Sequence, residues 1–249
     1  MKQKKINGGF TAIFKREIAS YFTSPIAYIF IVIFLLLSGF FTFYISGFFE
    51  AGQADLRSFF QWQPWIYIFL IPAISMKLWA DEKRIGSIEI LLTFPISLFD
   101  AVCAKFFAAW LFIGISLFFT FPMVITVLYL GSPDIGAIIC GYIGCLLIAG
   151  AFISIGAMTS SITDSQAISF IISAVISLFF ILAGYPPVTA AISGWTPLWF
   201  CKIIEEFGFL SHFNSIARGV IDIRDIIYYF SAIFFMLVLN CIILYKRRG

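Results

Sequence analysis

Hydrophobic residues in this chain fall into six long runs that contain no Asp, Glu, Lys or Arg. Each run is long enough for one membrane span, because a helix needs about 20 apolar residues to cross the hydrocarbon core. The runs are continuous and lack period-two alternation, so they predict helices rather than a closed barrel. The charge-free runs cover residues 18–49, 58–76, 106–133, 135–163, 165–201 and 226–245.

The sequence therefore predicts an all-α polytopic membrane protein with six transmembrane helices. The last span begins after Asp225, and Pro72 is expected to kink the second. Five spaced glycines in the fourth span predict a surface where a neighbouring helix approaches closely. The first five spans are expected at about 26–48, 62–79, 104–130, 135–160 and 166–184.

Residues 10–24, ahead of the first span, predict an amphipathic interfacial helix that ends at Ser24-Pro25. Its apolar residues recur at helical spacing, and Lys15 and Arg16 lie elsewhere on the helical wheel. Two interpretations stay open here. The helix is a simple membrane-surface anchor, or its polar face also docks a cytosolic partner.

A second amphipathic helix is predicted between spans two and three, over residues 82–94. Helical geometry places Glu82, Gly86 and Glu89 with Thr93 in one stripe and the apolar residues on another face. Pro95 cannot continue the helix. A helix that lies flat on the membrane has the same pattern, so this interpretation also stays open.

The fifth run is too long for one span. Glycine and proline residues break its end from Gly184 to Pro197. We therefore expect re-entrant or broken helical pieces, within a segment over residues 186–225, before the last span. Asp222 and Asp225 lie near the start of that span, where carboxylates favour the helix dipole.

Composition and charge fix the class of protein and its orientation. Only 12% of residues are charged, against about 25% in soluble domains, so residues 1–249 are expected to form a single transmembrane domain. Twelve Lys and Arg residues fall on the side of both termini and four on the other. The positive-inside rule then places both termini in the cytoplasm. The net charge of +3 requires no nucleic-acid partner.

Residues with catalytic chemistry are scarce. The chain has no Gly-Lys dipeptide, so it lacks a phosphate-binding loop for ATP hydrolysis. The single histidine, His212, is expected to be a plain interfacial residue, and no metal site is predicted. The middle thirds of the spans lack ionisable residues, which disfavours coupling to an ion gradient. If this protein moves a substrate against its gradient, the energy should come from another chain.

The stretch "ADEKRIGSIEILLTFPIS" at 80–97 resembles the loop between spans two and three of ABC transporter permeases of the type-2 exporter superfamily. The family pattern is an acidic and basic pair followed by G-[ST]-x-E-x-L-L-x-x-P. Eight residues match it by position: Glu82, Arg84, Gly86, Ser87, Glu89, Leu91, Leu92 and Pro95.

This resemblance implies roles for three segments. Residues 81–95 would be the coupling helix, which sits in a cleft of a separate ATP-binding subunit. Glu82, Arg84 and Glu89 would make polar contacts there, while the apolar residues Ile88, Leu91 and Leu92 would pack on that subunit or on the connecting helix. The connecting helix at 10–24 would include Phe14, Lys15, Arg16 and Glu17. The outward gate at 186–225 would include Pro186, Pro187, Arg218, Gly219 and Asp222.

The resemblance further implies a non-catalytic half-permease of an exporter in the bacterial inner (plasma) membrane. Two permease protomers, identical or different, would pair with two ATP-binding subunits that hold ATP and Mg, and the chain would bind no cofactor itself. The stretch "HFNSIARGVIDIRDIIYYF" resembles a bacterial subgroup that includes the gliding-motility permease. The alternative is a membrane adaptor or force-transmitting subunit that docks an ATPase and transports nothing. The substrate stays open.

Overall fold

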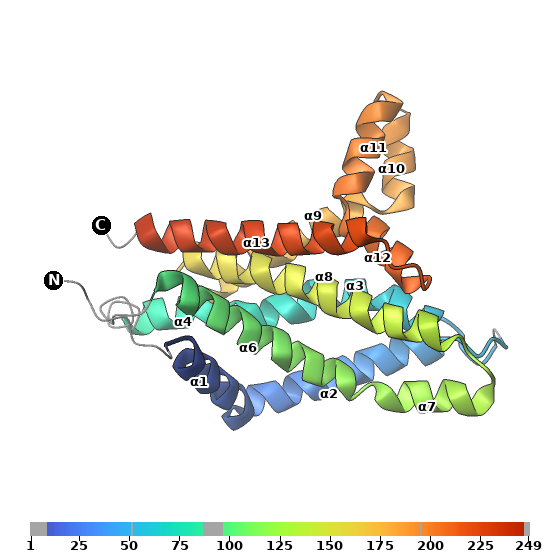
Figure 1. Cartoon of the computed structure of the whole chain (residues 1–249), viewed down its shortest axis with the longest axis horizontal. Helices are drawn as coiled ribbons and strands as arrows, with labels where there is room; N and C mark the ends of the chain where they lie inside the picture. Colours follow the sequence, from blue (N-terminus) through green and yellow to red (C-terminus); the bar gives the residue numbers. More distant parts are fainter. Residues whose placement is uncertain (1–8, 51, 87–96, 195, 247–249) are drawn as a thin grey trace.

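The computed structural model describes residues 9–50, 52–86, 97–194 and 196–246, and every regular element in them is helical (Figure 1). The elements follow one another in this order: α1 Gly9–Thr23, α2 Pro25–Phe40, the π-helical turn η1 Phe41–Ile45, α3 Arg57–Ser75, α4 Lys77–Ile85, α6 Leu98–Phe118, α7 Phe121–Leu130, α8 Ile135–Ile162, α9 Gln166–Ala183, α10 Pro186–Ser193, α11 Leu198–Phe207, α12 Phe209–Ala217 and α13 Ile223–Lys246.

The long helices run side by side, and both ends of the chain lie at the same end of the bundle (Figure 1). We call this the terminal end; it contains α1 and α4. The opposite end contains the connection from η1 to α3, the turn between α7 and α8, and α12. From that end α10 and α11 project sideways as a pair, across the direction of α13 (Figure 1).

Five helical stretches are long and apolar enough to cross a membrane: Pro25–Ile45, Leu98–Leu130, Ile135–Ile162, Gln166–Ala183 and Ile223–Lys246. The second predicted span falls on α3, which is not among these five because it carries polar residues such as Gln61 and Gln63. That span is also divided, since α3 ends at Ser75 and α4 begins at Lys77.

The third predicted span starts earlier than expected and is divided as well. Ser97 caps α6 by accepting a hydrogen bond from the Asp100 amide at 3.0 Å, which fixes the start of the helix at Leu98. A turn at Phe119 and Thr120 separates α6 from α7, whose first turn contains a proline. Lys105 therefore lies inside α6, not at the beginning of a span.

Helix α8 is the centre of the bundle. In its apolar window 78% of the residues are buried, compared with 22% in α13, so the other helices surround α8 and turn large apolar faces outward. Two glycines of α8 allow close contacts: a Cβ on Gly156 would lie 1.8 Å from Ser75 Oγ, and one on Gly141 would lie 2.4 Å from Phe60. The predicted packing role of these glycines is confirmed.

Candidate functional site

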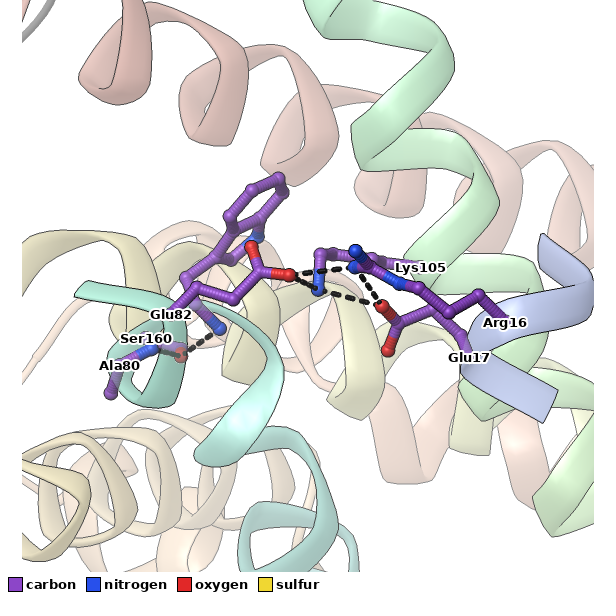
Figure 2. A network of polar contacts seen from close by, with 7 residues as sticks. Arg16, Glu17, Ala80, Glu82, Lys105 and Ser160 are labelled. Atoms are coloured by element: carbon purple, nitrogen blue, oxygen red, sulfur yellow. Dashed lines mark hydrogen bonds and ion pairs between the residues drawn. The ribbon is translucent and has the colours of Figure 1, made fainter. Parts of the chain in front are cut away.

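Helices α1, α4 and α6 meet at the terminal end, where four ionisable side chains form one network (Figure 2). Arg16 Nη2 lies 2.7 Å from Oε1 of Glu17 and 2.7 Å from Oε1 of Glu82. Lys105 Nζ lies 3.1 Å from the same Glu17 oxygen and 3.0 Å from the same Glu82 oxygen. Two cations thus face two carboxylates, and the network joins α1, α4 and α6.

The network is mostly withdrawn from solvent. The Lys105 side chain is 3% exposed, those of Glu17 and Glu82 are 14% and 15% exposed, and that of Arg16 is 54% exposed. Lys105 also lies over the Trp79 ring, 5.0 Å from its centroid. Charges at this depth are tolerated only when they are paired. The four side chains consequently depend on one another.

The pKa values of the α1 residues reflect this pairing. Burial alone would raise the pKa of Glu17, but the positive charges of Lys105 and Arg16 outweigh it and lower the pKa below its ordinary value. Burial alone would lower the pKa of Arg16, but the Glu17 and Glu82 carboxylates outweigh it and raise the pKa. Both groups are therefore charged at neutral pH.

Helix α4 is capped by a side chain from another helix. Ser160 Oγ of α8 accepts hydrogen bonds from the amides of Trp79 at 2.9 Å and Ala80 at 3.0 Å (Figure 2). The same hydroxyl donates to the Met76 carbonyl at 2.9 Å. The first amides of a helix have no partner within it, so Ser160 satisfies two of them and fixes the start of α4 against the central helix.

Further polar contacts tie α4 to the connection between α8 and α9. Lys83 donates to the Ser161 carbonyl and lies 3.8 Å from Asp164 Oδ1. Gln166 donates to the Asp81 carboxylate. Arg84, which is exposed, lies 3.6 Å from Asp81 within the same helix. Helix α4 is thus held on three sides, by α1 with α6, by α8, and by the start of α9.

The predicted helix over 82–94 does not run through Gly86. Helix α4 ends at Ile85, and Gly86 follows in the left-handed region with φ of 76°. This conformation is strained for residues with a side chain, and glycine is the usual residue there. The expected residues Ser87, Ile88, Glu89, Leu91, Leu92 and Pro95 lie outside the described residues.

A cavity of about 450 Å³ adjoins the ionic network between α1, α4 and α6. Arg16, Glu17, Glu82 and Lys105 line one part of it, and apolar residues such as Phe112 line another. The four charged groups of the network already bind one another. The arrangement therefore suits mechanical linkage of three helices better than the binding of a charged ligand.

Among the predicted connecting-helix residues, Arg16 and Glu17 enter the network, whereas Phe14 packs half-buried against the core and Lys15 is exposed. Sequence reasoning missed two partners in other helices. Lys105 was counted only among the basic residues on the side of the termini. A lysine within an apolar helix nevertheless indicates a buried partner. Ser160 carries no local signal, because only the packing of α8 against α4 gives it a role.

The predicted gate residues at the opposite end lie at helix ends. Pro186 and Pro187 begin α10, and Arg218 follows α12. Gly219 has φ of 89°, and Asp222 Oδ1 accepts a hydrogen bond from the Arg224 amide at 2.9 Å. Pro186 and Arg218 line one cavity. Pro187, Gly219 and Asp222 are not among the residues that line it.

His212 is not a plain interfacial residue. Its Nδ1 lies 2.6 Å from Oδ1 of the buried Asp225, and its Nε2 lies 2.9 Å from the Glu206 carbonyl. Its ring stacks on Tyr228 with centroids 4.0 Å apart. A carbonyl oxygen only accepts, so Nε2 donates to it and the bond to Asp225 needs one further proton shared by the pair.

Two tyrosines of α13 extend this contact. Tyr228 donates to the Phe207 carbonyl at 2.5 Å, and Tyr229 donates to the Phe209 carbonyl at 2.7 Å. We call His212, Asp225, Tyr228 and Tyr229 the α12–α13 clasp. It holds the end of α11 and the start of α12 against α13.

Neither end resembles a metal centre. Within residues 9–50, 52–86, 97–194 and 196–246, no group of three or more His, Cys, Asp or Glu side chains is placed to hold a metal ion.

Comparison with known protein families places most of the chain in one of them. Residues 11–198 match the sequence model of a family described as "ABC-2 family transporter protein". These residues include most of α1, all of α4 and the whole ionic network. No curated protein matches the chain.

Proposed function

The chain belongs to the ABC-2 family of transporter proteins as a membrane permease subunit, and from this membership we propose that the terminal end of the bundle is where its ATP-binding subunit docks. The permease is a multi-pass membrane protein and a non-catalytic transporter subunit, and ABC-2 permeases work with ATP-binding subunits. Movement of the chain's helices must therefore be driven from a surface that the ATP-binding subunit can reach.

In the proposed arrangement α3 is a sixth span, and both termini face the cytoplasm. Two observations support it. Helix α3 runs alongside the five apolar helices and returns the chain to the terminal end (Figure 1). Twelve of the sixteen Lys and Arg residues fall on the side of the termini, in agreement with the positive-inside rule. On the family resemblance, the membrane is the bacterial inner membrane and the permease works as a pair of protomers.

The ionic network is the observation that carries the proposal. The segment after Gly86 would enter a cleft of the ATP-binding subunit, with Glu89 in contact. Helix α4 leads directly to that segment, and Glu82 joins α4 to Arg16 and Lys105. A movement imposed on the segment would then reach α1 and α6 together, as a rigid unit. Glu82 would serve this transmission from inside the bundle and not contact the ATP-binding subunit itself.

The first experiment tests docking. The permease is purified from its native membrane, and the chains that accompany it are identified and assayed for ATPase activity. We expect an ATP-binding subunit to accompany the wild type and to be lost with Glu89→Lys. The matched control is Glu50→Lys, the same charge reversal at an exposed residue of the opposite end. If no ATPase accompanies the wild type, or if it stays with Glu89→Lys, the proposed docking surface is wrong.

A second variant separates docking from transmission. With Glu82→Gln we expect the ATP-binding subunit to remain bound, because the docking segment is unchanged, while the permease loses its effect on the rate of ATP hydrolysis. Loss of the subunit itself would assign Glu82 to the docking surface instead.

Membership of the gliding-motility subgroup is not proposed for this chain. The resemblance to gliding-motility permeases depends on residues 212–230, which lie beyond the matched residues 11–198. Nothing else found in the chain supports that subgroup.

A further inference from the structure

A second cavity, of about 650 Å³, lies at the opposite end of the bundle. It is formed where the start of α3, the start of α10 and the end of α12 come together. This volume lies in the range of cavities that bind small molecules. The cavity is far from the ionic network along the bundle (Figure 1), so docking of the ATP-binding subunit does not account for it.

Two arginines line this cavity. Arg57 is the first residue of α3, and Arg218 directly follows α12. Both are exposed, and no ion pair within 4.0 Å joins either side chain to another of the described residues. Arg57 adds its charge to the positive end of the α3 dipole, which is an unfavourable place for a cation unless an anion is bound.

Two carboxylates lie in the neighbourhood of these arginines, but both already have partners. Asp55 and Asp134 line a smaller adjoining cavity of about 130 Å³ together with Arg57 and Arg218. Asp55 accepts a hydrogen bond from the Arg57 amide at 3.1 Å. Asp134 accepts from the amides that begin α8, at 2.8 Å and 3.2 Å. Neither aspartate forms an ion pair within 4.0 Å with Arg57 or Arg218, so the two guanidinium groups can bind an external anion.

The remaining wall of the larger cavity is mainly apolar and aromatic. Phe60 and Phe213 are buried behind it, and Trp65 meets Tyr185 edge to face with centroids 5.4 Å apart. The side-chain amide of Asn214 adds a hydrogen-bonding group. A ligand that fits both the two arginines and the apolar wall has an anionic head and an apolar body.

We propose that this cavity binds an anionic amphiphile, with its phosphate or carboxylate head on Arg57 and Arg218 and its apolar part along Trp65 and Tyr185. Guanidinium groups suit this role because they bind phosphate and carboxylate through two parallel hydrogen bonds. The amphiphile comes from the outer leaflet as an anionic lipid. This inference rests on the proposed orientation of the permease and names the class of molecule that meets its outward end.

The test uses the purified full-length permease in nanodiscs of phosphatidylcholine, without the ATP-binding subunit. Tryptophan fluorescence is quenched with phosphatidylglycerol or phosphatidylcholine that carries brominated acyl chains. We expect phosphatidylglycerol to be preferred by about tenfold or more, the usual effect of charge-assisted hydrogen bonds. The preference should disappear in the double variant Arg57→Gln/Arg218→Gln. Trp65 is one of six tryptophans, so the quenching assigned to the cavity is the part that Trp65→Phe removes.

Arg224→Gln is the matched control, since it removes an exposed arginine of the same end that does not line the cavity. It should keep the lipid preference. Added inorganic phosphate distinguishes an amphiphile from a free anion. If the wild type binds inorganic phosphate but shows no preference for phosphatidylglycerol over phosphatidylcholine, the ligand is a free anion and the amphiphile assignment is overturned. If the double variant still prefers phosphatidylglycerol, the arginine site is overturned. Neither result bears on docking of the ATP-binding subunit, which is tested by co-purification.

Discussion

At the terminal end three helices are joined by charged side chains, whereas at the opposite end α11, α12 and α13 are joined mainly by hydrogen bonds to backbone carbonyls. In the ionic network each charge depends on the others, because Glu17, Glu82 and Lys105 are largely buried. In the α12–α13 clasp, His212 Nε2, Tyr228 and Tyr229 each bind a carbonyl of their own, and His212 Nδ1 binds the Asp225 carboxylate.

This difference has consequences for movement. Loss of one charge unbalances the other buried charges, so a change at one residue of the ionic network affects the contacts of α1, α4 and α6 together. Loss of one hydrogen bond in the clasp leaves the remaining bonds in place. We therefore expect the terminal end to move as one unit and the opposite end to loosen in steps, which suits a driven end and a gating end.

The largest expected effect comes from Lys105→Met. It removes the more buried of the two cations that face Glu17 and Glu82, and removal of one member of a buried ion pair costs about 3–5 kcal/mol of stability. We expect a clearly lower melting temperature in detergent. The control Lys15→Met removes an exposed lysine of α1 and should melt like the wild type.

A compensating variant sharpens this test. Adding Glu17→Gln to Lys105→Met restores the balance of charge, with Arg16 facing Glu82. Part of the lost stability should then return. If Lys105→Met alone melts like Lys15→Met, the ionic network does not hold the three helices together.

The next effect concerns the clasp. His212→Ala removes the partner of the buried Asp225, and hydrogen bonds to charged groups contribute about 1.5–3 kcal/mol. Hydrogen–deuterium exchange should become faster in α11 and α12 and stay unchanged in α1 and α4. Ser215→Ala, at a half-buried serine of α12, serves as the control. Faster exchange at both ends of the bundle would mean that the two ends are not independent.

Two glycines provide a matched pair of smaller effects. Gly86 and Gly52 have φ of 76° and 60°, and nothing lies within 4 Å of an added Cβ at either position. Replacing either glycine with alanine should therefore lower the free energy of unfolding by about 1–2 kcal/mol, because alanine is strained in the left-handed backbone conformation. Gly86→Ala should also reduce the coupling of ATP hydrolysis to the permease, and Gly52→Ala should not. If ATP hydrolysis is coupled to the permease equally well in both variants, the end of α4 has no part in energy transfer.

The smallest effect is the pH dependence at Glu17. Because its folded-state pKa lies below the ordinary value of 4.5, its ionised form stabilises the fold above that pH, and the contribution is lost as the pH falls through the folded-state pKa. The melting temperatures of wild type and Glu17→Gln should differ at neutral pH and converge below pH 4.5. A difference that grows on acidification would contradict the assigned sign.

Much of the fold could be predicted from the pattern of residues. The fourth and fifth spans were expected at 135–160 and 166–184, and α8 and α9 occupy 135–162 and 166–183. Their ends are marked locally, by Asp134 at the start of α8 and Gly184 after α9. Less could be predicted where helices divide, as at Met76 and at Phe119 to Thr120, because a charge-free run contains no signal for such a break.

Less of the candidate site could be predicted. Glu82 was expected in the coupling helix and Arg16 and Glu17 in the connecting helix, but the sequence offered no reason to place Lys105 between the two carboxylates. His212 was interpreted without a partner, although Asp225 lies only 13 residues further along the chain. In both cases the partner belongs to another helix, and spacing along the chain says nothing about which helix ends meet.

The sequence by itself determined that this protein spans a membrane by helices, which end carries the positive charge, and that it lacks a phosphate-binding loop. These properties depend on composition and local pattern, and both are set by the order of residues alone. Only the tertiary structure decided that α8 is central, that α4 ends at Ile85, and that charges from three helices share one buried network. The reason is that burial and pairing arise between segments far apart in the chain, and helix packing alone brings them within hydrogen-bonding distance.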